Sequence, residues 1–491
     1  MPLSENSFIL KNDGTLWGCG KNDYSILGLG NTSRKIMFTE ITTNTNNIKS
    51  VYCGGDHAFI LKNDGTLWAC GDNQYGQLGL GDTTYRTTFT QVTTSTDNIK
   101  LICCGSGHTL MMKNDNTLWG CGRNEAGQLG LGDTTNRNIF TQITTNADNI
   151  KSIYCCSNHT FALKNNNTLW ACGYNEHGRL GLGDKNSRTT FTQVTINADN
   201  IKSVYCGGPH AFILKNDGTL WGCGYNGNSQ LGLGDTNSRT TFTQITTNTD
   251  NIKSVYCGYH HTLILKNDGT LWGCGLNDSG QLGLGDTSNR TTFTIIGINS
   301  GNIRKICCGY SHTFILKNDG TLWGCGYNEY GQLGLEDMTN RNIFTQITVN
   351  TDNIKCFAND YSAPSTIKIY DSKIGYAETL DTNNFRNIPI NTIEKLKSLC
   401  VKPVNTYLNC LISFDKKQTW KTFDGTDWTI VLDISPQNII LNGMEVSGLN
   451  SLDKQKLISG GFTGDLDFKI AMKTNNKNKT PSVTKIYIEY K

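Results

Sequence analysis

Six histidines and the cysteines beside them are the residues of this sequence best suited to chemistry. Each histidine follows a cysteine by four residues, and an imidazole next to a thiol can act as the base that activates a nucleophile. The copies are 51 residues apart, however, and an enzyme needs one asymmetric group of residues rather than six identical pairs. We therefore expect a structural role, in which each imidazole binds backbone groups of its own turn. The histidines are His57, His108, His159, His210, His261 and His312.

Two further recurring groups could bind phosphate. The loop "GQLGLGD" is glycine-rich, but it lacks the Gly-Lys-Ser/Thr ending of a P-loop and no helix is expected after it. A recurring arginine follows an aspartate by four residues, which favours ion pairs within the loop over a ring for DNA phosphates. The formal net charge of +3 gives no strong attraction to nucleic acid or membrane. The arginines are Arg86, Arg137, Arg188, Arg239, Arg290 and Arg341.

Nineteen cysteines could indicate a disulfide framework or zinc ligands. Most of them recur at two strand positions of a chain too long to need disulfide staples, so buried free thiols are the favoured interpretation. The sequence contains no CxxC pair, and no paired carboxylates or nucleophile–base pair stand out from the repeat. We therefore expect a protein that is not an enzyme, with no catalytic residue, no metal and no cofactor.

All of these residues recur because the chain repeats one unit of 51 residues up to about Phe357. Each unit contains short apolar stretches bounded by turn residues and no sustained 3.6-residue period, which predicts four antiparallel strands and no helix. A period of this length predicts a solenoid or a propeller. We expect an all-β, seven-bladed β-propeller over residues 1–360. Seven tryptophans mark the units: Trp17, Trp68, Trp119, Trp170, Trp221, Trp272 and Trp323.

Two features of the repeat predict its turns and its closure. Asn116 and Asn167 replace the glycine of the recurring "KNDG" turn, which indicates a position with left-handed backbone. The first unit starts at "NSFILKNDGTLW" without its first strand, and residues 350–360 supply one more copy of that strand. We predict that this copy pairs beside Ser7–Leu10, so that the first blade is built from both ends of the ring.

The repeat resembles that of the regulator of chromosome condensation (RCC1) family. The units carry G-x-x-H-T, D-G-x-L-W and N-x-x-G-Q-L-G motifs at similar spacing, as in "YCGGDHAFILKNDGTLWACGDNQYGQLGLGD". The resemblance covers residues 1–357 and implies the β-propeller fold. It does not imply one function, because this propeller carries unrelated activities.

Positions that are the same in every unit are expected to maintain the blade structure, whereas positions that differ between units are free of that requirement. Two groups vary most: the residues just before the recurring histidine, and those four to seven residues after the tryptophan. The loops that carry them emerge at the same end of an up-and-down blade, so we expect one variable rim, rich in tyrosine as recognition surfaces are. Neutral drift in exposed loops is the alternative. The candidate ligand-binding residues are Tyr24, Tyr75, Arg123, Tyr174, His177, Tyr225, Tyr259, His260, Tyr310, Tyr327 and Tyr330.

The repeat stops near residue 360, and residues 361–491 are predicted to form a smaller β-rich, sandwich-like domain. The stretches "STIKIY", "DWTIVLDI" and "VTKIYIEY" predict strands, whereas "NTIEKLKSL" and "NSLDKQKLI" predict one or two short helices. The stretch "SFDKKQTW" (413–420) resembles an Asp-box, a hairpin motif found in sialidases and in many non-enzymes. This part of the chain resembles modules of bacteriophage tail and tail-fibre proteins.

These features favour a non-enzymatic structural and recognition protein, namely a fibre or receptor-binding component of a bacteriophage tail or tail-like bacteriocin. Its variable rim would bind a bacterial surface carbohydrate or protein. Its other partners would be tail and baseplate proteins or further copies of itself, with no nucleic acid and no membrane insertion. We expect it in the virion or tail particle, made in the bacterial cytoplasm, because no signal peptide is visible.

Three alternatives belong to other functional classes. The first is an RCC1-like regulator of a small GTPase or of chromatin, although the strict repeat leaves no insertion that could act as a nucleotide-exchange wedge. The second is an inhibitory propeller that clamps a partner enzyme on the variable rim. The third is a glycosidase, which release of reducing sugar from cell wall would support.

Overall fold

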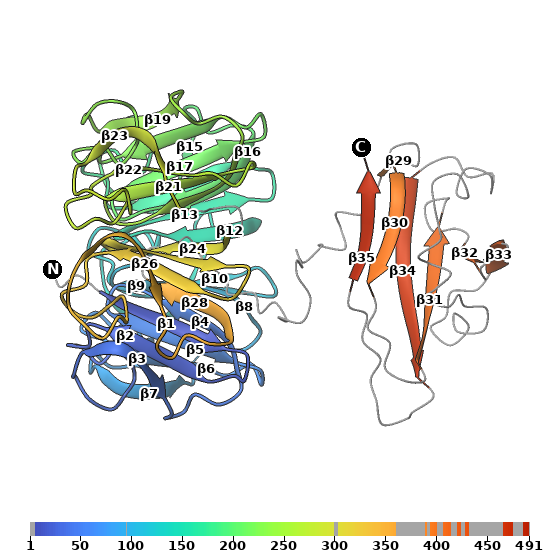
Figure 1. Cartoon of the computed structure of the whole chain (residues 1–491), viewed down its shortest axis with the longest axis horizontal. Coiled ribbons are helices and arrows are strands. Elements are labelled where there is room, and N and C mark those ends of the chain that lie inside the picture. Colours follow the sequence, from blue (N-terminus) through green and yellow to red (C-terminus); the bar gives the residue numbers. More distant parts are fainter. Residues whose placement is uncertain are drawn as a thin grey trace. The chain divides into compact units, whose positions relative to one another are not determined.

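The computed structural model describes residues 5–94, 96–298 and 303–359, together with strands β29–β35 of the C-terminal part (Figure 1). The chain divides into two units, residues 1–369 and 370–491. Residues 5–359 form seven four-stranded antiparallel sheets, which confirms the predicted seven-bladed β-propeller. We number the blades in chain order: blade 1 is β28-β1-β2-β3, and blades 2 to 7 run from β4–β7 to β24–β27.

The first two strands of each blade lie on the inner side of the ring. First strands of neighbouring blades contact each other all around it, including β28 with both β24 and β4. The first strands are β4 (Ile48–Cys53), β8 (Ile99–Cys104), β12 (Ile150–Cys155), β16 (Ile201–Cys206), β20 (Ile252–Cys257), β24 (Ile303–Cys308) and β28 (Ile354–Asn359). The second strands are β1 (Asn6–Lys11), β5 (His57–Lys62), β9 (His108–Lys113), β13 (His159–Lys164), β17 (His210–Lys215), β21 (His261–Lys266) and β25 (His312–Lys317).

The third and fourth strands complete each blade on its outer side. The third strands are β2 (Leu16–Gly20), β6 (Leu67–Gly71), β10 (Leu118–Gly122), β14 (Leu169–Gly173), β18 (Leu220–Gly224), β22 (Leu271–Gly275) and β26 (Leu322–Gly326). The fourth strands are β3 (Lys35–Ile41), β7 (Arg86–Val92), β11 (Arg137–Ile143), β15 (Arg188–Val194), β19 (Arg239–Ile245), β23 (Arg290–Ile296) and β27 (Arg341–Ile347).

The ring is closed by a strand from the far end of the repeat. Strand β28 pairs antiparallel with β1, and the register places Ser7 opposite Asn359 and Leu10 opposite Cys356. This pairing confirms the predicted closure. A closed ring leaves no blade with an open edge toward its neighbours, and open edges are the sites at which β-sheets associate wrongly.

The apolar core lies between blades, because each blade packs one face of its sheet on the next. The loop "GQLGLGD" makes this contact close: a Cβ on Gly79 would come within 2.8 Å of the Phe140 ring in the following blade. The loop therefore passes close to the next blade, as expected for a structural loop. The "KNDG" turns also agree with prediction, since Gly65 has φ 85° while Asn116 and Asn167 have φ 65° and 62°.

Recurring charged residues stabilise the loops and turns. Each of the six recurring arginines pairs with the aspartate four residues before it, as Arg86 does with Asp82 at 2.6 Å, which confirms the expected ion pairs. The lysine of the "KNDG" turn lies over the tryptophan of the third strand, with Lys164 Nζ 4.2 Å from the Trp170 ring centroid. Its ammonium also donates to Asp148 at 2.8 Å, which joins the turn to the connection between blades.

The recurring histidines do not bind backbone groups of their own turns, so that prediction is wrong. Five of the six imidazoles pack on a glycine of their own turn, as His57 does on Gly54, and their Nε2 atoms meet a hydroxyl of the next blade; the turn of His159 has Cys156 in place of the glycine. His57 Nε2 lies 2.9 Å from Thr109 Oγ1, and His108, His210 and His261 repeat the contact at 3.0–3.1 Å. All six histidines are fully buried, and every one except His159 contacts a hydroxyl of the next blade.

The cysteines are mostly buried thiols. Burial raises the pKa of thiols such as Cys19 and Cys70 well above the usual value. Cys156 and Cys206 form a disulfide between blades 4 and 5. The interpretation as buried free thiols therefore holds for residues such as Cys19 and Cys70 and not for this pair.

Strands of the C-terminal unit form a five-stranded sheet in the order β29-β34-β31-β32-β33 and a separate pair, β30-β35. The segment predicted as the first helix contains strand β30, which pairs with β35, so that prediction is wrong. The three-residue spacing of Ile393, Leu396 and Leu399 suits a helix face, but the pairing with another strand decides the outcome. The strands are β29 (Ile388–Pro389), β30 (Ile393–Leu399), β31 (Thr406–Ser413), β32 (Trp420–Phe423), β33 (Trp428–Val431), β34 (Asp465–Thr474) and β35 (Lys485–Tyr490).

Two of the three stretches predicted as strands in this unit contain strands of the structure. "DWTIVLDI" contains β33 and "VTKIYIEY" contains β35. The Asp-box-like stretch connects two antiparallel strands, with Ser413 of β31 opposite Trp420 of β32. The stretch "STIKIY" and the second predicted helix lie outside the described residues.

Candidate functional site

Backbone hydrogen bonds divide the propeller loops into two rims. On one rim, the loop after the third strand bonds to the loop before the histidine, as Arg123 N does to Gly107 O at 2.8 Å. On the other rim, the "KNDG" turn bonds to the connection between blades, as Asn114 N does to Asn98 O at 2.8 Å. The first rim carries both groups of varying residues, and we call it the variable rim.

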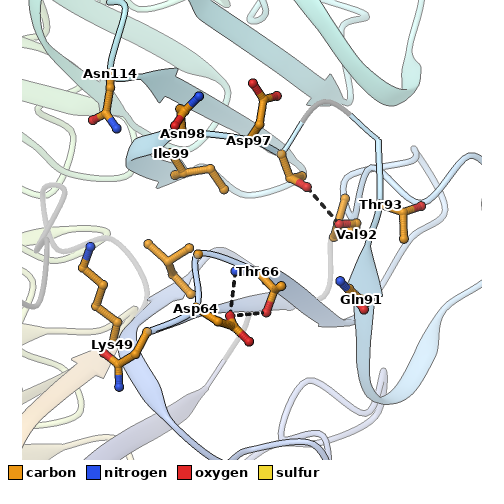
Figure 2. Close-up of a pocket in the computed structure, with 14 residues that line it drawn as sticks. Lys49, Asp64, Thr66, Gln91, Val92, Thr93, Asp97, Asn98, Ile99 and Asn114 are labelled. Carbon is orange, nitrogen blue, oxygen red and sulfur yellow. Dashed lines mark hydrogen bonds between the residues drawn. The ribbon is translucent and has the colours of Figure 1, made fainter.

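The opposite rim carries a hollow of about 760 Å³ between blades 2 and 3. Figure 2 shows Lys49 and Asp64 on one side of this hollow and Asp97, Asn98 and Asn114 on the other. Asp64 already accepts hydrogen bonds from the backbone and hydroxyl of Thr66, so its carboxylate holds the turn. The same turn recurs around the ring, and a repeated structural turn is a poor candidate for one specific ligand.

Five predicted residues form a continuous aromatic track across the variable rim of blades 4 to 7. The ring centroids of His177 and Tyr225 are 4.9 Å apart, and those of Tyr225 and His260 are 5.6 Å apart. His260 meets Tyr259 edge-on at 4.5 Å, and Tyr259 stacks on Tyr310 at 4.3 Å. All five side chains are half-buried, so each presents part of its surface to solvent.

The other six predicted residues lie on the same rim but outside this track. Arg123 lies over the Tyr75 ring at 5.1 Å and pairs with Glu125. Tyr327 lies 6.0 Å from Tyr330, beside Lys21. Tyr174 donates to Glu176, and Tyr24 lies near the carboxylates of blade 2. A second hollow of about 430 Å³ lies between Arg123 and Tyr174.

A carboxyl group on the variable rim was missed as a candidate. Asp56 is 8% exposed, and burial raises the pKa of its carboxyl to about 7, against the opposing charge of Lys21. The nearby carboxylate of Asp72 adds to the rise. Asp56 is one of the residues before the recurring histidine that vary between units, but the sequence alone does not show that its side chain is buried.

Arg179 was also missed, although a sequence signal was present. The fourth unit reads "GRLGLGD" where five units have glutamine at the same position. The Arg179 side chain is 5% exposed, and its guanidinium lies 4.7 Å from the centroid of the Tyr174 ring. Burial lowers the pKa of Arg179, and the nearby Tyr259, Tyr174 and Glu176 oppose this effect.

Two features of the described residues bear on the class of site. No group of three or more histidine, cysteine, aspartate or glutamate side chains converges to hold a metal ion in this part of the chain. In the same residues, no helix has the length and apolar character needed to cross a membrane. The variable rim therefore offers aromatic rings, two arginines and buried carboxyl groups for binding.

Family models and relatives agree on the repeat. The RCC1-like domain model matches residues 4–208, and the regulator of chromosome condensation (RCC1) repeat model matches residues 217–265, 268–316 and 319–357. The ultraviolet-B receptor UVR8 of Arabidopsis thaliana is 30% identical over 340 residues, which cover 67% of this chain and 76% of UVR8. The chain belongs to the RCC1-like repeat family.

Two other RCC1-like proteins show the range of the family. The human X-linked retinitis pigmentosa GTPase regulator is 33% identical over 315 residues, which are 60% of this chain but only 29% of that regulator. Prp20p from Saccharomyces cerevisiae, a structure characterised for binding to Gsp1p and histones, superposes with a TM-score of 0.61 at 18% identity. This match covers 72% of the RCC1-like chain and 88% of Prp20p, and it shows the shared fold.

These relatives correct the predicted function. They are eukaryotic receptors and regulators, so the prediction of a bacteriophage tail or bacteriocin component is wrong. The predicted partners, a bacterial surface carbohydrate or protein and other tail proteins, are wrong for the same reason, and a place on a virion has no support among these relatives. The alternative, an RCC1-like regulatory binding protein, agrees with them. The ligand-binding role of the eleven rim residues stays a prediction.

Proposed function

We propose that this chain is a non-enzymatic, RCC1-like regulatory protein that binds a partner protein on its variable rim. The aromatic track carries this proposal, because five half-buried rings touch in sequence across four blades. Protein-binding surfaces are enriched in such rings, which supply a large contact area at little cost in conformational entropy. On the opposite rim the half-buried aromatic residue is the tryptophan that recurs in every unit, and each tryptophan is covered by the lysine of its own turn.

The strict repeat indicates how the partner is held. Every unit has 51 residues, so no loop of the variable rim carries a long insertion. Contact must therefore come from side chains of several blades, each supplying one or two residues. A surface assembled in this way suits an exposed segment of a partner protein better than an enzyme substrate that must be enclosed.

A small GTPase is the partner class that the relatives favour. One relative is named as a GTPase regulator, and Prp20p is characterised for binding to Gsp1p. Because the loops lack an inserted wedge, we expect this chain to bind its partner without greatly accelerating nucleotide release.

The test measures binding of the purified chain to a panel of small GTPases by biolayer interferometry. Tyr225→Ala and Tyr259→Ala should each weaken binding about tenfold, as loss of a central aromatic anchor does. Lys49→Ala and Asn114→Ala, on the opposite rim, are the matched controls and should bind as the unchanged chain does. A panel without any binder, or an equal loss in the control variants, would refute the proposal.

A further inference from the structure

Arg179 is a buried charge without the partners that buried charges normally have. Its side chain is 5% exposed, and its Nε has no hydrogen-bond partner among the described residues. No ion pair of Arg179 occurs in this part of the chain, whereas Arg123 on the same rim pairs with Glu125 at 2.7 Å. An unpaired buried charge is unfavourable, so such a group persists where something outside the folded chain completes it.

The groups around Arg179 add no negative charge within bonding distance. Tyr174 lies against the guanidinium, and four imidazoles lie close enough to interact with it electrostatically. Burial is the first cause that lowers the pKa of each imidazole, to about 4 for His260, so these rings are neutral near pH 7. Glu176 is the acidic residue that interacts with Arg179, but it is exposed and accepts a hydrogen bond from the Tyr174 hydroxyl.

The position is specific to blade 4. Five other units have glutamine here, and their side chains bond within the rim, as Gln332 does to Glu5 at 2.9 Å and Gln230 to His260 at 3.2 Å. Glutamine therefore satisfies the fold at this site. The arginine is not needed for the blade contact, and its charge remains available to a ligand.

The aromatic track runs beside this charge. His177 and Tyr225 belong to blades 4 and 5, next to Arg179, and Tyr259 interacts electrostatically with it. A partner segment lying on these rings would bring its side chains to the guanidinium. The fork of an arginine matches the two oxygens of a carboxylate better than any other protein group does.

We infer that Arg179 is the anchor for an aspartate or glutamate carboxylate of the partner protein, with the aromatic track holding the chain on either side of that residue. This inference rests on the proposed binding function and names the chemistry that the partner must present. The carboxylate would supply the negative charge that the described residues do not place on Arg179, and it would accept two parallel hydrogen bonds.

The test uses an arrayed library of short synthetic peptides in matched pairs that differ only by one central glutamate or glutamine. The unchanged full chain should prefer the glutamate member of bound pairs by about tenfold, the value expected for a hydrogen bond to a charged group. Arg179→Gln should remove this preference while keeping the affinity for the glutamine peptides. Arg179→Lys should restore part of it, because a lysine keeps the charge but not the fork.

Arg179→Gln is expected to fold, since it installs the residue that five other blades carry, and its urea midpoint verifies this. A chain that binds both members of each pair equally, that binds no acidic peptide, or that keeps its preference in Arg179→Gln overturns the inference. A stronger preference for phosphoserine than for glutamate overturns the carboxylate assignment as well. None of these results refutes the proposed function, which is refuted by a GTPase panel without any binder or by an equal loss of binding in the opposite-rim control variants.

Discussion

Hydroxyl groups at one strand position determine whether Nε2 of each buried imidazole between blades has a hydrogen-bond partner. Four histidines meet a threonine hydroxyl of the next blade, and His312 meets Ser7 at 3.4 Å. Blade 5 has Ala211 at the threonine position, and neither ring nitrogen of His159 has a partner. Blade 2 has Ala58 there, and Asn6 of blade 1 is likewise unpaired. The repeat therefore contains two defects of the same origin.

Restoring the hydroxyl at one defect should stabilise the protein. We expect Ala211→Thr to give His159 the partner that the equivalent histidines have, and to raise the free energy of unfolding by about 1 kcal/mol. Urea unfolding measures the change. Ala211→Val has nearly the same shape without the hydroxyl, so an equal gain in that variant would show that packing, and not the hydrogen bond, is responsible.

The Asp56 carboxyl should make stability depend on pH. Its pKa is about 7 in the folded chain, above the value of 3.8 for an exposed carboxyl, so folding favours the protonated form. This contribution is complete below pH 4 and is lost as the pH rises toward 7. Between pH 5 and pH 8, Asp56→Asn should gain about 2–3 kcal/mol of unfolding free energy relative to the unchanged chain.

The comparison between variant and unchanged chain isolates Asp56, because the buried histidines titrate in both. Asparagine is tolerated at this position, since blade 4 carries Asn158 there. Glu40→Gln, an exposed change on β3, is the control and should not alter the pH profile. Parallel profiles for Asp56→Asn and the unchanged chain would contradict the assignment.

At the scale of single residues, the sequence predicted the aromatic members of the site and missed its buried charges. Tyr225, Tyr259 and Tyr310 were found because their positions vary between units while the blade framework does not. Arg179 lies in a loop motif that otherwise looks purely structural, and only its deviation from glutamine marks it. The burial of Arg179 and its lack of an acidic partner depend on side chains from blades 4 to 6. These side chains are distant in sequence, so the residues next to Arg179 in the chain do not reveal them.

At the scale of elements, the strands of each blade could be predicted because turn residues near them in sequence mark where they begin and end. Strand boundaries coincide with turn residues, and Asn116 and Asn167 occur where the backbone is left-handed. The histidine contacts were predicted wrongly because they cross between blades, and their partner Thr109 is one whole unit away from His57. Strand β30 was mistaken for a helix for a similar reason: its partner, β35, is distant in sequence.

At the scale of the whole molecule, one strand holds the ring together. Strand β28 is the only described strand from beyond blade 7 that enters the propeller, and it pairs along β1. A ring closed in this way distributes its stability over every interface between blades, because opening any one of them requires the ring to deform. We propose that residues 1–360 are sufficient for this ring.

Truncation tests both closure and the proposed boundary. A chain ending at residue 360 should unfold in one transition with the Tm of the propeller in the full chain. A chain ending at residue 353 lacks β28, and we expect its Tm to be lower by about 5 °C or more, with association through the open edge of β1. Differential scanning calorimetry and analytical ultracentrifugation measure the two effects. Equal Tm values for the two chains would show that β28 is dispensable.

Closure by β28 also sets the order of events during biosynthesis. Of the propeller strands, the ribosome releases β1 first and β28 last, so synthesis of the ring at about 5–20 residues per second takes on the order of 20–70 s. Throughout that time the nascent propeller cannot complete blade 1, whose exposed backbone is open to chaperones and to other nascent chains. Co-translational maturation of the propeller therefore ends with blade 1, the blade whose synthesis began first.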